Sequence, residues 1–177
     1  MKKPILLFLM IVVLVTPCSL RGQSLTGGGV KPTKVLESGD SVLEAMVSGK
    51  PIRVVITTYR VDLGATRPTP PPTGEGNTNC TYSRFPCSQV SNLRIWVAGN
   101  RLFVPRSVFA DIADVGNMSM ASEGGVNILT LVGGDGSEAY SVKVFFGVDR
   151  VKKREFYGLE SNKVLQVTTY QPLPVFD

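Results

Sequence analysis

Carboxylates are the side chains of this sequence with the widest scope for chemistry, because the 177 residues include 14 Asp and Glu but no His. The lack of an imidazole excludes the Ser/His/Asp and Cys/His mechanisms of nucleophilic catalysis. No serine lies in the G-x-S-x-G pattern of a nucleophile elbow. Any catalysis would therefore depend on carboxylates that the fold brings close together.

Two groups of acids stand close enough in the sequence to be considered. Asp111 and Asp114 lie three residues apart and would share one face of a helix, although chance supplies such a pair among 14 acids. Asp135 and Glu138 lie in the run GGDGSE, which suggests a calcium loop but fits a tight hairpin with glycines at positive φ better. We therefore expect no catalytic, metal or cofactor site. A small secreted hydrolase or calcium-dependent lectin-like module that uses these four acids is the alternative.

The segment NCTYSRFPC contains the only two cysteines beyond the N-terminal region, Cys80 and Cys87. An isolated pair in one loop of an exported protein most often closes as a disulfide. A metal site would need further ligands, and the chain has neither a His nor a second Cys pair to supply them. The sequence predicts a Cys80–Cys87 disulfide.

Trp96 is the only tryptophan in the sequence. Arg94 lies two residues before it, in a segment where apolar residues alternate with other residues. Alternation places both side chains on the face opposite Leu93, Ile95 and Val97. If that face meets solvent, a Trp beside an Arg is a candidate for a protein interface or for stacking on a sugar. If both faces of the sheet are covered, Trp96 belongs to the core, and this second interpretation is the safer one.

Residues 1–22 have the layout of a secretory signal peptide. Lys2 and Lys3 precede an apolar run over 5–15, and a polar, turn-prone segment follows at 16–19. A membrane-spanning helix needs about 20 apolar residues, so this run is too short for a permanent anchor. We expect export to the periplasm or the extracellular space, with no membrane span after cleavage.

Cleavage can fall after Cys18 or after Gly22, since both end the leader on a small residue. Pro17 argues against lipidation of Cys18, because a small residue should precede a lipidated cysteine. Removal of residues 1–22 lowers the count of basic groups from 19 to 16, against 14 acidic ones, so the net charge falls from +5 to +2. This charge argues against a nucleic-acid partner.

Short apolar segments separated by turn residues fill the remainder of the chain. Residues 23–40 read as a flexible leader, residues 41–174 as a single β-rich domain, and residues 62–92 as a long Pro-rich loop stapled by the disulfide. A short helix is expected over 106–114. The expected strands are 41–47, 52–61, 93–97, 102–104, 118–122, 126–132, 139–148, 151–157 and 163–170.

Regular spacing of short strands indicates a mainly β fold, either an antiparallel β-sandwich or a barrel-like meander, with one short helix. Parallel strands would need crossover helices, for which the chain has no room. The sequence resembles no known family in a way that indicates a function. We expect an exported, non-catalytic domain that acts by binding an unknown protein or small ligand, or as a structural module.

Overall fold

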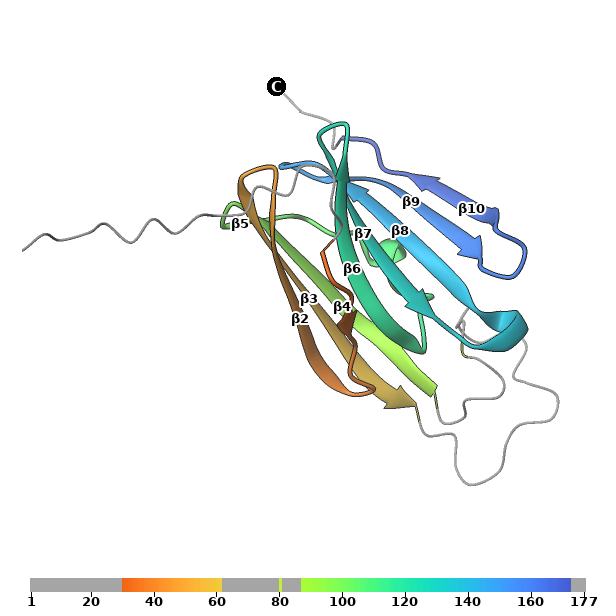
Figure 1. Ribbon diagram of the computed structural model, residues 1–177. Coiled ribbons are helices and arrows are strands. Elements are labelled where there is room, and N and C mark those ends of the chain that lie inside the picture. Colours follow the sequence, from red (N-terminus) through yellow and green to blue (C-terminus); the bar gives the residue numbers. More distant parts are fainter. Residues whose placement is uncertain (1–29, 62–79, 81–86, 173–177) are drawn as a thin grey trace, which may run out of the picture.

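A computed structural model describes residues 30–61, 80 and 87–172. These residues form two antiparallel β-sheets packed face to face, as the β-sandwich prediction requires (Figure 1). The strands are β1 Thr33–Lys34, β2 Gly39–Val47, β3 Lys50–Val61, β4 Cys87–Val97, β5 Asn100–Arg101, β6 Val115–Glu123, β7 Val126–Gly133, β8 Tyr140–Phe146, β9 Val151–Gly158 and β10 Lys163–Thr169. Two short 3-10 turns are η1 Arg106–Val108 and η2 Gly136–Glu138.

The smaller sheet has the order β2-β3-β4-β5, and the larger has the order β1-β6-β7-β8-β9-β10. Apart from β1, each sheet is built from strands that follow one another in sequence. Short connections join most of them, as antiparallel pairing allows, but the connection between β3 and β4 spans residues 62–86. Strand β1 precedes the smaller sheet in sequence but pairs with β6 of the larger one, so the N-terminal segment ties the two sheets together. Of the two expected architectures, the structure is the β-sandwich.

Period-2 alternation builds the core between the sheets. Leu43, Val54 and Ile95 of the smaller sheet are buried and belong to one cluster with Leu131 and Val144 of the larger sheet. Along the central strands of the two sheets, every second residue therefore faces the opposite sheet, and its neighbours face outward. The outward side chains of the smaller sheet form an open face that includes Trp96.

Two hairpin turns fix the register of the smaller sheet. Ser48 and Gly49 have φ values of 49° and 74°, and Ala98 and Gly99 have values of 51° and 83°. Two successive residues at positive φ are the mark of a type I′ turn, whose twist matches that of the strands it joins. The sequence pattern predicts this hairpin with its turn at Gly99-Asn100; the turn lies one residue earlier, at Ala98-Gly99, and sets Trp96 opposite Arg101.

The prediction of a helix over 106–114 is largely wrong. Only Arg106–Val108 forms a 3-10 turn, after which the chain turns back towards β4. Ile112 O accepts the N–H of Val90 at 3.0 Å, and Asp114 N–H donates to Ser88 O at 2.6 Å. These hydrogen bonds to the edge of β4 satisfy the backbone groups of residues 112 and 114, which therefore do not depend on hydrogen bonds within a helix.

Other boundaries also differ from expectation. The strand expected over 102–104 does not form, and β5 lies at Asn100–Arg101 instead. The leader expected to end at residue 40 is part of the packed domain from β1 onward, since Val35 is buried in the core. The loop expected to end at residue 92 ends where β4 begins at Cys87, because these residues pair with the end of β3. The strand expected over 139–148 ends at Phe146, and Val148 is exposed because Gly147 N–H turns to the carbonyl of Arg150.

Several predictions concern residues beyond those described. The signal peptide over 1–22 and the Pro-rich segment over 62–79 lie outside the described ranges. Within the described ranges, none of the helical segments has the length and apolar character that a bilayer crossing requires.

Candidate binding face

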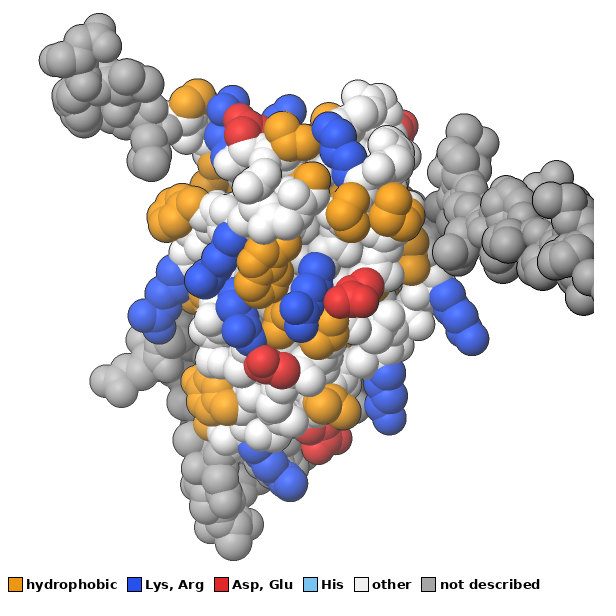
Figure 2. Space-filling view, turned by 90° about the vertical axis from the view of Figure 1, so that its left-hand side faces the viewer, with side chains coloured by type: hydrophobic (Ala, Val, Ile, Leu, Met, Phe, Trp, Pro, Cys, Tyr) orange, Lys and Arg blue, Asp and Glu red, His pale blue; other side chains and the backbone are white. Residues whose placement is uncertain are grey.

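The outer face of the smaller sheet carries the predicted pair Arg94 and Trp96. Leu93, Ile95 and Val97 are buried on the inner side, which confirms the alternation. Trp96 and Arg94 are only partly buried. Figure 2 shows this face, with hydrophobic side chains at the surface among Lys, Arg and acidic side chains. The described part of the chain thus places Trp96 at the surface and not in the sandwich core.

One row of side chains crosses this face from strand to strand. Glu44 of β2 is opposite Arg53 of β3, Arg53 is opposite Trp96 of β4, and Trp96 is opposite Arg101 of β5. The guanidinium carbons of Arg53 and Arg101 lie 5.7 Å and 5.9 Å from the centre of the Trp96 ring. Both distances are within the range of a cation–π contact. Two cations from neighbouring strands therefore orient the indole.

A hollow of about 600 Å³ lies beside this row. Met46, which is 57% exposed, contributes an apolar side chain to its wall. The full lining is Glu44, Ala45, Met46, Pro51, Ile52, Arg53, Trp96 and Gly99. We call this hollow and the row across it the Trp96 face.

Arg94 is held one row away from Trp96. Its Nη2 lies 2.7 Å from Oδ2 of Asp40 and 3.2 Å from Oγ1 of Thr57. Hydrogen bonds from Thr57 and from Arg94 hold the pKa of Asp40 below its usual value. The charge of Arg94 is thus matched by a neighbouring carboxylate, as that of Arg53 is by Glu44 at 3.5 Å. Arg101, in contrast, has no carboxylate within ion-pair distance among the described side chains.

Sequence reasoning identified Arg94 and Trp96 but missed Arg53 and Arg101. A two-residue turn at Ala98-Gly99 pairs Trp96 with Arg101, whereas the predicted turn at Gly99-Asn100 would have set Trp96 opposite Phe103. Arg53 is harder to find, because the register of β3 on β4 depends on a connection that spans residues 62–86. The presence of a hairpin was therefore predictable from the sequence, but neither of the two pairings with Trp96 was.

The four acids of the alternative function do not form a group of metal ligands in the described structure. Asp111 binds both its oxygens to Arg154, and Oδ1 of Asp114 accepts the N–H of Ser88 at 2.9 Å. Asp135 and Glu138 lie at the start and end of η2, where the N–H of Glu138 donates to the carbonyl of Asp135. In the described residues, no three of these acids bring ligand oxygens within 4.8 Å of one another.

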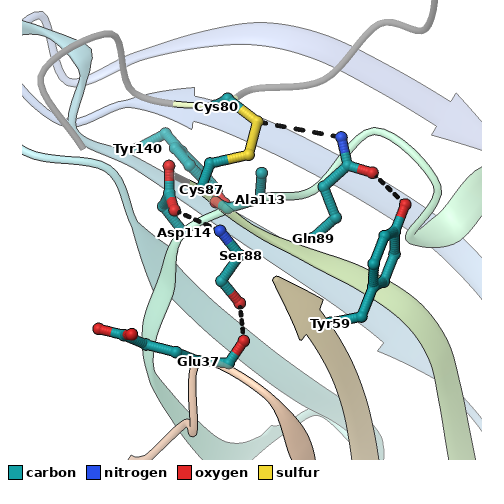
Figure 3. Close-up of a disulfide and its surroundings, with 9 residues drawn as sticks. All are labelled: Glu37, Tyr59, Cys80, Cys87, Ser88, Gln89, Ala113, Asp114 and Tyr140. Carbon is teal, nitrogen blue, oxygen red and sulfur yellow. Dashed lines mark hydrogen bonds between the residues drawn. A yellow bond between two sulfur atoms is a disulfide. The ribbon is translucent and has the colours of Figure 1, made fainter. Parts of the chain in front are cut away.

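The predicted disulfide joins Cys80 to Cys87 at the start of β4 (Figure 3). Its sulfurs lie with a carboxylate oxygen of Asp114 in the one described group of three metal-ligating atoms. The two sulfurs are bonded to each other, so in this state they are not thiolates able to bind a cation. The side chains around the bridge hold it by ordinary contacts, such as Gln89 Nε2 at 3.9 Å from Cys80 Sγ.

The chain was compared with protein families, curated proteins and solved structures. No family model matches it, and no curated protein or solved structure shows significant similarity. The chemistry of the described side chains is therefore the ground on which a function can be proposed.

Proposed function

We propose that this protein is an exported, non-catalytic binding domain that docks a partner protein on the Trp96 face. The observation that carries the proposal is the Trp96 ring, which lies on an open sheet face between Arg53 and Arg101 and beside an apolar hollow. Trp, Arg and Met are enriched in protein interfaces relative to other surface. Trp and Arg also dominate the few positions that supply most of the binding energy.

The rigidity of the sheet supports the same role. Trp96 and its two cations belong to three strands joined by hydrogen bonds, so their relative positions are fixed before any ligand arrives. Pre-ordered side chains lose little conformational entropy on binding. A sheet face of this kind suits the docking of a surface better than the enclosure of a small molecule, which requires a deep cavity.

Arg101 indicates the chemistry of the partner. Its guanidinium has no ion-pair partner among the described carboxylates, while Trp96 and Met46 offer apolar surface next to it. A partner segment with an Asp or Glu beside an apolar side chain would occupy both features at once. We therefore expect a partner surface of that composition.

Export is part of the proposal. Residues 1–22 have the signal-peptide pattern, and the Cys80–Cys87 disulfide is the kind of cross-link that persists in the periplasm or outside the cell. Mass spectrometry of the protein recovered from an exported fraction should find residues 1–18 or 1–22 removed. An intact N-terminus in the cytosol would contradict this part of the proposal.

The hydrolase or lectin-like alternative has less support. Asp111 and Asp114 are engaged by Arg154 and by the N–H of Ser88, and among the described residues no three of the four acids bring ligand oxygens within 4.8 Å of one another. Alanine substitution of Asp135 and Glu138 should leave partner binding unchanged. Loss of a hydrolytic or calcium-dependent binding activity in that variant would favour the alternative.

Photo-cross-linking from the exported fraction tests the binding function. A photoreactive residue at Met46 should cross-link one partner, and the same residue at Thr130, on the outer face of the larger sheet, should not. The change Trp96→Ala should weaken binding of that partner about 30-fold, which is the effect of losing a hot-spot residue. Because Trp96 is the only tryptophan, its fluorescence should also shift when the purified partner binds.

Phe145→Ala provides a matched control. Phe145 is a partly buried aromatic residue on the outer face of the larger sheet, and the Lys153 ammonium lies 4.2 Å from its ring centre. This variant removes a cation–π contact elsewhere on the protein and should leave binding unchanged. Equal losses in Trp96→Ala and Phe145→Ala would show that the Trp96 face is not the binding site.

A further inference from the structure

Strand β10 forms an outer edge of the larger sheet and exposes apolar side chains. It pairs with β9 alone in the described structure. Val164, Leu165 and Val167 are 47%, 63% and 54% exposed, and only Thr168 of the strand is even partly buried. Figure 1 shows the strand at the far end of the larger sheet, away from β2 and the Trp96 face. A long apolar edge of this type is a template for pairing with another strand.

The backbone of β10 has groups directed to the open side. Tyr170 N–H donates to the carbonyl of Lys152 at 2.9 Å, so at that position the backbone faces β9. Because backbone groups alternate between the two sides of a strand, the N–H and C=O groups of Val167 and Thr169 face away from β9. Both residues lie within the regular part of the β9–β10 register.

Among the residues that the structure describes, the other sheet edges have features that discourage pairing, and β10 lacks these features. Strand β2 has the acidic side chains Asp40 and Glu44 along its length, and strands β1 and β5 contain two residues each. Charges and short length are the usual means by which edge strands avoid pairing. Strand β10 has seven residues and one charge, Lys163, at its beginning.

We propose that β10 pairs antiparallel with β10 of a second copy of this chain, so that the two larger sheets join into one. Antiparallel pairing places the two Lys163 side chains at opposite ends of the joint and leaves no like charges side by side. It also brings the exposed Val and Leu side chains of the two copies together. Self-pairing therefore sets apolar side chains against apolar side chains and keeps the single charge of each strand at the ends, so a second copy is the occupant that fits this edge. The contact is two-fold symmetric, as most homodimer interfaces are.

Analytical ultracentrifugation of the purified protein over about a hundredfold range of concentration tests this inference. The wild type should show a monomer–dimer equilibrium. Val167→Pro removes an N–H that faces the open side and no hydrogen bond to β9, so the fold should persist while the dimer dissociation constant rises at least about tenfold. Val167→Lys should have the same effect by placing charge at the joint. Leu36→Lys, at a position 52% exposed in the segment before β2, is the matched control and should dimerise like the wild type.

Hydrogen exchange on the unmodified protein provides a test that does not depend on variants. The amides of Val167 and Thr169 should be protected at high concentration and exchange quickly on dilution. Fast exchange at every concentration would overturn the proposal. Protection that does not depend on concentration would overturn it too, because a segment of the same chain would then cover the edge. The proposal would also be overturned by a wild-type protein that remains monomeric in ultracentrifugation. It would be overturned as well if both Val167 variants still formed the dimer. None of these outcomes bears on the Trp96 face.

Discussion

Arg154 of β9 and Asp111 of the segment after η1 form an ion pair in which Nη2 lies 2.8 Å from each carboxylate oxygen. Arg154 is 2% exposed, so its charge lies almost wholly inside the protein. Its Nη1 also donates to Gln166 Oε1 of β10 at 3.1 Å. One buried cation therefore links the crossover between the sheets to the last two strands.

Removal of either partner of this ion pair should destabilise the fold to different extents. Asp111→Ala leaves a buried cation without its counter-charge and should lower the free energy of unfolding by about 3 kcal/mol. Arg154→Met replaces that cation with an apolar side chain of similar length, and the remaining Asp111 is partly solvated, so the loss should be smaller. Urea denaturation of both variants measures the difference. A larger loss in Arg154→Met would show that the cation itself is required.

The disulfide should contribute to stability through the short loop it closes. Cys80 and Cys87 are seven residues apart in sequence. Loop-closure entropy for such a separation predicts that the double change to Ser lowers the free energy of unfolding by about 2.5 kcal/mol. Denaturation of the wild type under reducing conditions should give a matching loss. An unchanged midpoint after reduction would mean that the cross-link does not constrain the unfolded chain.

Glycines 134 and 124 should differ sharply in their tolerance of alanine. Both adopt positive φ, 69° and 55°. A Cβ at Gly134 would lie 2.4 Å from the carbonyl oxygen of Glu138, whereas a Cβ at Gly124 would meet nothing within 4 Å. We expect Gly124→Ala to cost about 1 kcal/mol for the backbone conformation alone. Gly134→Ala should cost about 3 kcal/mol, because the clash with backbone adds to that strain. Equal thermal shifts in the two variants would refute this explanation.

Acid should weaken the contacts of Asp40 with Arg94 and Thr57 on the outer face of the smaller sheet. Hydrogen bonds from Thr57 and Arg94 lower the pKa of Asp40, so the folded state prefers the charged carboxylate. The resulting stability is present above the ordinary aspartate pKa of about 3.9 and is lost as pH falls through the lower folded value. Carboxyl NMR titration should show a depressed pKa in the wild type and a rise towards the ordinary value in Thr57→Val and in Arg94→Gln. A pKa of Asp40 that neither substitution changes would mean that these two hydrogen bonds are not its cause.

Local patterns determined most of the strands and the turns between them. Alternation in Leu93 to Val97 and the short turn at Gly99 define a hairpin whatever the rest of the chain does, because side-chain direction and turn type depend on neighbouring residues alone. The Cys80–Cys87 bridge was readable for the same reason, since a short loop brings its two ends together. Alternation also separated Trp96 from the buried side of its strand.

Tertiary structure decided which of these strands became neighbours. Arg53 reaches Trp96 only through the register of β3 on β4, and Arg154 meets Asp111 only where the crossover lies against β9. The predicted helix over 106–114 gave way because β4 offered its residues backbone partners. The sequence of β10 could equally describe a covered strand, because a period of two distinguishes the faces of a strand but not an edge from a centre. The pairing of strands that are far apart in sequence depends on the packing of the whole sandwich, and a local sequence pattern carries no information about that packing.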